Sequence, residues 1–162
     1  MSYQCAHCGE MHDELPQYFL SRAPENAKGK TLKIERDGKA MCRSGKKCFI
    51  FCEVEFPFQE PNLEPLGYVC WAEVAPKDYK ALQKFWETNA PEDDPGPVEG
   101  TMANELTGIP GTYGTRVRFV PLAKDPTPYV RWIDPDSHLG RLVTARITRT
   151  FWHDLVAAVK AQ

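Results

Sequence analysis

The sequence contains no long apolar run, no excess of charge of one sign and no internal repeat. Its hydrophobic stretches, such as residues 48–52, are far shorter than the roughly 18 residues that a membrane-spanning helix needs. The 22 acidic and 20 basic side chains leave a net charge of −2, which provides no general attraction to phosphate backbones or anionic membranes. The first residues also lack a basic segment followed by an apolar one. We therefore expect a cytoplasmic protein that does not associate with membranes and does not bind nucleic acid.

The length and composition are those of one globular domain. A chain of 162 residues can bury roughly 70% of the surface that its unfolded form exposes, which is enough for a single core. The content of 42% hydrophobic and 26% charged residues is typical of a folded protein. We expect one domain over residues 1–162, in which residues 1–16 form a separate N-terminal segment.

Hydrophobic periodicity predicts a run of strands that is interrupted by helices. Alternation of apolar residues favours strands over residues 31–36, 39–42, 46–59, 66–74, 98–103, 115–121 and 129–133. Helices are expected from Pro76, over 137–143 and over 148–159 with Thr148 as N-cap, and one helical turn is expected around 15–19. The helix from Pro76 should bury an apolar stripe of Tyr79, Leu82, Phe85 and Trp86. The second long strand, 66–74, should run antiparallel to 46–59. This pattern predicts an α+β fold, in which helices cover one face of a mostly antiparallel sheet.

The clearest chemical motif is the pair Cys5 and Cys8 in the stretch CAHCGEMH. Two residues between the thiolates allow a tight turn that directs both sulfurs to one Zn²⁺ ion, and Gly9 suits that turn. A redox pair would need a preceding strand and a following helix, and no strand precedes Cys5. A zinc knuckle is therefore the favoured interpretation; a redox pair and a site without metal remain alternatives.

A structural zinc site needs four protein ligands, so the knuckle requires two more. His12 is close enough in sequence to fold back on the same ion, whereas His7 should point away from it. A three-residue hairpin loop over 44–46 would place Cys42 opposite Cys48, with about 5 Å between their Cα atoms, so either thiol could reach the ion. Cys52 would lie about 13 Å further along the strand. Cys70 is expected to be a core residue.

The opening CAHCGEMHDELP resembles the start of a bacterial family that is catalogued only as a domain of unknown function. Looser similarity continues through Cys42, the FW pair that ends the aromatic helix, the segment GTMANEL and the segments DSHLG and ARIT. The resemblance implies that the zinc ligands are Cys5, Cys8, His12 and Cys42, with Cys48 as the substitute for His12. This sequence differs from the family pattern at residues 39–41, near Cys42, where relatives usually have an acidic residue. The resemblance implies no activity.

The leading functional prediction is a binding module with one structural zinc ion, whose partner is a protein or a small molecule. The alternative is a zinc-dependent hydrolase, in which the knuckle would hold a catalytic ion and Glu10 would act as general base. Asp134, Asp136 and His138 gather polar groups after a strand, and we interpret them as the capping region of a helix rather than as a catalytic site. The alternating basic residues Arg116, Arg118 and Arg131 are interpreted as the solvated face of a sheet. The sequence indicates no oligomeric state.

Overall fold

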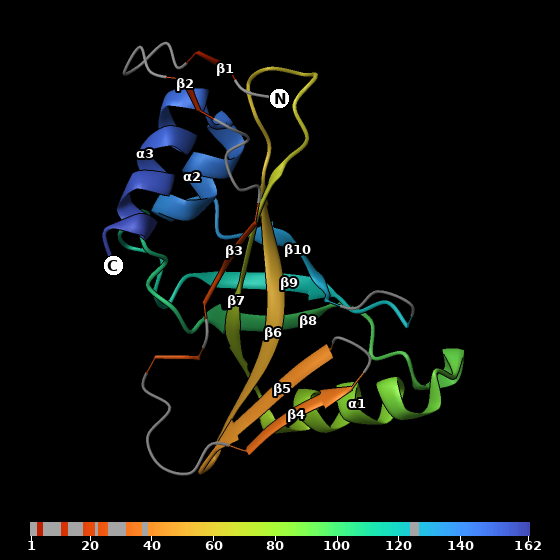
Figure 1. Ribbon diagram of the computed structural model, residues 1–162. Coiled ribbons are helices and arrows are strands. Elements are labelled where there is room, and N and C mark those ends of the chain that lie inside the picture. Colours follow the sequence, from red (N-terminus) through yellow and green to blue (C-terminus); the bar gives the residue numbers. More distant parts are fainter. Residues whose placement is uncertain are drawn as a thin grey trace.

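The computed structural model describes residues 3–4, 11–12, 18–21, 23–25, 32–36, 39–123 and 127–162. Figure 1 shows its strands and helices. The strands are β1 (Tyr3–Gln4), β2 (Met11–His12), β3 (Tyr18–Leu20), β4 (Leu32–Arg36), β5 (Lys39–Ser44), β6 (Lys47–Phe56), β7 (Leu66–Val74), β8 (Val98–Met102), β9 (Arg116–Val120) and β10 (Tyr129–Ile133). The helices are α1 (Pro76–Thr88), the short 3₁₀ turn η1 (Pro91–Asp93), α2 (His138–Ala145) and α3 (Arg149–Lys160). The predicted α+β class is confirmed.

Five of the strands close into a barrel. The eight-stranded sheet has the order β3-β7-β8-β9-β10-β6-β5-β4. Because β7 also pairs with β6, the strands β6, β7, β8, β9 and β10 form a closed ring. Consecutive strands of the ring run antiparallel, as predicted for β6 and β7. Because the ring has an odd number of strands, its closing pair must be parallel, and Tyr129 of β10 indeed pairs with Glu53 of β6 in parallel.

The core fills the barrel because inward positions alternate along each strand. Cys48, Ile50, Cys52, Val54 and Phe56 of β6 all belong to the main core, as the period of two predicts. The middle of the opposite face is buried too, since Phe49 and the partly buried Phe51 pack with Cys42, Trp71 and Ala103 in a second, smaller cluster. Burial on both faces explains why the residues of this strand are apolar with few interruptions.

The helices lie at opposite ends of the barrel, and the prediction that they cover one face of the sheet is wrong (Figure 1). The stripe of α1 that was predicted from its spacing, Tyr79, Leu82, Phe85 and Trp86, is buried and joins the main core. Trp152, Leu155 and Val156 of α3 join the same core. A closed barrel leaves no open inner face for a helix layer, so the apolar stripes pack at its two ends instead.

Two further local predictions differ from the structure. Residues 18–20 form β3, parallel to β7 with Tyr18 beside Gly67, instead of part of a helical turn. The β5–β6 connection is shorter by one residue than predicted, because Ser44 pairs with Lys47 and only Gly45 and Lys46 form the turn. Gly45 has a φ of 60°, as the first central residue of a type II′ hairpin requires. Among the helices of the described residues, none is long and apolar enough to cross a membrane.

Candidate functional site

The predicted zinc ligands lie largely outside the described part of the chain. Cys5, Cys8 and the proposed base Glu10 are not among the described residues. For His12 the backbone pairing is described: β2 pairs with β1, and Gln4 lies beside Met11. The short strand β1 directly precedes Cys5, where the sequence predicted no strand. Within the described residues, no group of three or more His, Cys, Asp or Glu side chains could hold a metal ion. The zinc site stays a prediction.

The position of Cys42 relative to Cys48 differs from the sequence prediction. The shorter turn pairs Cys42 with Phe49 and Arg43 with Cys48. A shift of one residue moves a side chain to the other face of a sheet, so the two thiols lie on opposite faces. Cys48 belongs to the main core, where burial raises the pKa of its thiol. Cys42 belongs to the second, smaller cluster on the opposite face, and it is only 1% exposed there. The two thiols therefore cannot both approach one ion while the strands keep this pairing.

Sequence reasoning treated Cys52 and Cys70 separately, and the fold brings them together. The antiparallel register of β6 and β7 places them directly opposite each other inside the barrel. Their thiols are reduced, and both side chains are fully buried. The hydrogen bond with Cys52 and burial hold the pKa of the Cys70 thiol well above its ordinary value. A thiol in this state is a poor nucleophile and a poor metal ligand, so this pair is part of the core.

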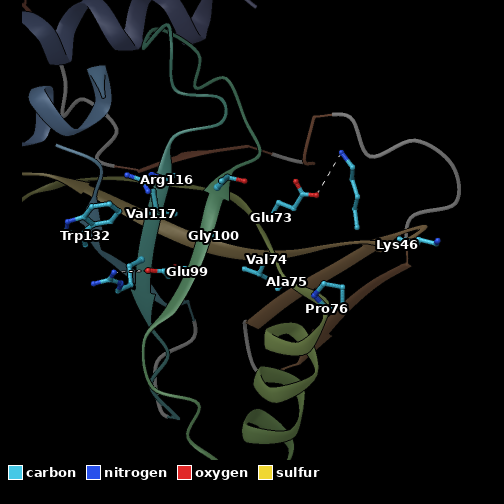
Figure 2. A pocket seen from close by; sticks show the side chains of 13 residues that line it. Lys46, Glu73, Val74, Ala75, Pro76, Glu99, Gly100, Arg116, Val117 and Trp132 are labelled. Carbon is cyan, nitrogen blue, oxygen red and sulfur yellow. Dashed lines mark hydrogen bonds and ion pairs between the residues drawn. The ribbon is translucent and has the colours of Figure 1, made fainter. Parts of the chain in front are cut away.

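A cavity of about 640 Å³ lies on the outer surface of the barrel, between the β5–β6 turn, the start of α1 and strands β7 to β10 (Figure 2). Strand register sets its floor in two rows. One row crosses β7, β8 and β9 through Glu73, Thr101 and Arg116. The other crosses β8, β9 and β10 through Glu99, Arg118 and Trp132. All these residues face outward because their neighbours in sequence, such as Val117 and Phe119, face the core.

The lining of the cavity is positively charged although the chain as a whole is negative. Its charged side chains are four cations and two anions, a net +2: Lys46, Lys47, Arg116, Arg118, Glu73 and Glu99. Asp134 lies outside the lining and pairs with Arg116 at 3.4 Å. Counting its charge as well leaves the net charge around the cavity positive. The chain carries −2. The cavity is therefore a local region of opposite sign to the protein's net charge.

Two arginines are held against an exposed tryptophan at one end of the cavity. Trp132 is 36% exposed, while the other three tryptophans of the chain are buried. The guanidinium carbons of Arg116 and Arg118 lie 5.9 and 5.3 Å from the centre of its ring, the distance of a cation–π contact. Arg118 also pairs with Glu99 at 2.8 Å. Each guanidinium has five N–H donors, so these contacts orient the two arginines and leave most of their donors for a ligand.

The group Asp134, Asp136 and His138 forms a helix start, as predicted. Ser137 is the N-cap of α2: its hydroxyl accepts the Gly140 N–H at 2.9 Å. Asp134 accepts the N–H of Asp136 at 3.0 Å and pairs with Arg116, so it supports the cavity from its edge.

Glu53 is a buried acid that sequence reasoning did not identify. It lies on the outer face of β6, is only 7% exposed and has a raised pKa, because burial disfavours the carboxylate and Glu55 adds like charge. Glu55 is exposed on the same strand. The position of Glu53 between the buried residues Cys52 and Val54 was the available signal.

The cavity itself could not be found from the sequence, because its residues come from five strands and a helix start. The alternation of Arg116 and Arg118 along β9 indicated a solvated face; Arg116 is exposed and Arg118 is partly exposed. The sequence carried no sign that Trp132 would lie beside both of them, since that contact depends on the pairing of β9 with β10.

Comparison with known proteins identifies the family. Residues 4–145 match the model of a family described as an uncharacterized protein conserved in bacteria, DUF2199. No curated protein and no solved structure matches the chain. Because the match covers most of the chain, the protein belongs to the DUF2199 family of uncharacterised bacterial proteins.

Proposed function

We propose that this protein is a binding module for a small anionic molecule, which it holds in the cavity over β7 to β10. The observation that carries the proposal is the contrast between the net +2 of the lining and the −2 of the whole chain. A concave region of one sign raises the local concentration of ions of the opposite sign. The volume of about 640 Å³ lies within the range of small-molecule sites.

The arginine end supports an oxyanion as the bound group. Guanidinium groups match the planar geometry of carboxylate and phosphate, and hydrogen bonds to charged groups contribute about 1.5–3 kcal/mol each. Arg116 and Arg118 are positioned before a ligand arrives, because each contacts Trp132 and an acidic partner. Preorganisation reduces the entropy that binding would cost.

Titration of the purified protein with inorganic phosphate, citrate and AMP tests this proposal. Trp132 is the reporter, since an anion beside it should change its fluorescence, and Trp132→Phe should abolish that signal. Arg118→Ala should weaken binding at least tenfold, whereas Arg141→Ala, which removes an exposed arginine of α2 outside the cavity, should not. The proposal fails if none of the three anions binds at millimolar concentration, or if both arginine variants bind equally.

We also propose that one structural Zn²⁺ ion, held by Cys5, Cys8, His12 and Cys42, attaches the N-terminus to the sheet. Thiolates with an imidazole are the donor set that a structural zinc prefers. The pairing of β1 with β2 brings Gln4 beside Met11, the residues on either side of the segment that carries the two cysteines, and Cys42 lies on the outer face of the sheet rather than in the main core.

Zinc content of the purified protein tests this second proposal. We expect about one zinc per chain, with loss of metal and a lower melting temperature in Cys5→Ser and Cys42→Ser. Cys48→Ser is the matched control, because Cys48 lies on the opposite face of the sheet from Cys42 and should keep the metal. Metal loss in Cys48→Ser with retention in Cys42→Ser would overturn this ligand set.

A further inference from the structure

We propose that the ligand of this cavity is an elongated molecule with an anionic group at each end and an apolar middle, of the α,ω-dicarboxylate type. This inference rests on the proposed function and names the ligand class of the same site. It comes from how the lining is distributed: basic side chains lie at both ends, and between them lie small apolar residues together with Glu73, which pairs with Lys47 (Figure 2).

One end of the cavity is formed by Arg116, Arg118 and Trp132. Figure 2 shows Trp132 and Arg116 together on one side, with Glu99 close by. The register of β9 and β10 sets this arrangement, because Arg118 and Trp132 are direct cross-strand neighbours. Two oriented guanidiniums can donate several hydrogen bonds to one carboxylate or phosphate.

The opposite end is formed by the β5–β6 turn. Lys46 occupies the turn and lies at the far side of the cavity in Figure 2. Lys47 pairs with Glu73 at 3.9 Å, and no ion pair of Lys46 occurs among the described residues. This end is therefore lined by one more cation than anion. The tight turn, with Gly45 at a φ of 60°, fixes the backbone position of Lys46.

The middle of the cavity is partly apolar, and its one charged side chain, Glu73, is paired with Lys47. Val74, Ala75 and Pro76 lie between the two ends in Figure 2, where β7 passes into α1. Thr101 adds one hydroxyl to the floor beside Arg116. A methylene chain can cover such a surface without leaving buried polar groups unpaired, whereas a polar linker would lose its hydrogen bonds with water.

The number of strands between the two ends indicates an extended ligand. Along the floor of the cavity, β7 and β8 lie between Lys47 on β6 and Arg116 on β9, so the two ends are on strands that do not pair with each other. A compact anion can contact only one end at a time.

Calorimetric titration with succinate, adipate, suberate and sebacate, and with octanoate as the monoanionic match of suberate, tests this inference. Affinity should rise from succinate to a longer diacid, and the best diacid should bind at least tenfold more tightly than octanoate. In the double variant Lys46→Gln/Lys47→Gln, the affinity for the best diacid should fall to that for octanoate, and the affinity for octanoate should not change. Lys160→Gln, which removes an exposed lysine of α3, serves as the control.

The outcomes separate the two levels of the proposal. If octanoate binds as tightly as every diacid, or if the lysine variant does not affect the diacids, the two-ended ligand is wrong. In that case binding that still depends on Arg118 would leave the general anion site intact. If neither the diacids nor phosphate, citrate and AMP bind at all, the proposed function fails as well.

Discussion

Replacement of Gly140 by alanine should destabilise the protein, although alanine is normally the better helix residue. Gly140 lies in the first turn of α2, where the chain returns sharply after β10. A Cβ built on it would overlap the carbonyl oxygen of Asp134 and would lie 2.9 Å from the carbonyl carbon and 3.1 Å from the Cα of Pro135. These three atoms belong to the backbone, so they cannot rotate away as a side chain could.

The magnitude follows from two opposing effects. Alanine in place of glycine in a helix contributes up to about 1 kcal/mol of stability. Overpacking costs about 1–3 kcal/mol, and more where the obstructing atoms are rigid. The Ser137 hydroxyl bridges the Asp134 carbonyl and the Gly140 N–H at 2.6 and 2.9 Å, so moving the helix away would also break the cap. We expect a net loss of about 2 kcal/mol, which lowers the melting temperature by about 4–8 °C in a protein of this size.

Thermal unfolding followed by far-UV circular dichroism measures this effect. Thr144→Ala is the matched control, because it introduces alanine at an exposed position of the same helix and should change the melting temperature by no more than about 2 °C. A Gly140→Ala variant that melts at or above the temperature of the parent protein would refute the reasoning, since the predicted backbone overlap could not then exist.

Three other substitutions test individual contacts. Asn104→Ala should lower the free energy of unfolding by about 2 kcal/mol in chemical denaturation, because it removes the side-chain oxygen that accepts the buried backbone N–H of Trp71 at 2.8 Å; an unchanged value would contradict this role. Thr148→Ala should cost about 1 kcal/mol by the same measurement, since its hydroxyl accepts the Phe151 N–H at 3.1 Å at the start of α3, and Thr148→Ser should retain most of this stability. Glu53→Gln should raise the melting temperature at neutral pH, because the raised pKa of Glu53 means that its ionised form is disfavoured in the folded state. This gain should disappear as the pH falls below the ordinary carboxyl value of 4.5, where the folded and unfolded states are both protonated; a gain that is equal at all pH values would show that charge is not its cause.

Features that depend on neighbours in sequence could be predicted from the sequence by itself. The strands over 66–74 and 129–133 have the predicted bounds, because apolar alternation reports directly on a strand with a buried face. The buried stripe of α1 and the capping role of Thr148 were also correct, since helical spacing and N-cap chemistry act within one or two turns. The α+β class followed from the order of these elements.

Features that depend on pairing between distant segments were decided only by the tertiary structure. Closure of β6 with β10 placed the helices at opposite ends of the barrel, and packing beside β7 made residues 18–20 a strand. A hairpin turn shorter by one residue separated Cys42 from Cys48, because the side-chain period of a strand is two. The cavity arose in the same way: its charges are unremarkable in sequence, and only the registers of β7 to β10 bring Arg116, Arg118 and Trp132 to one end of it. Local patterns determine which elements form, whereas strand register, which joins residues far apart in the chain, determines which side chains meet.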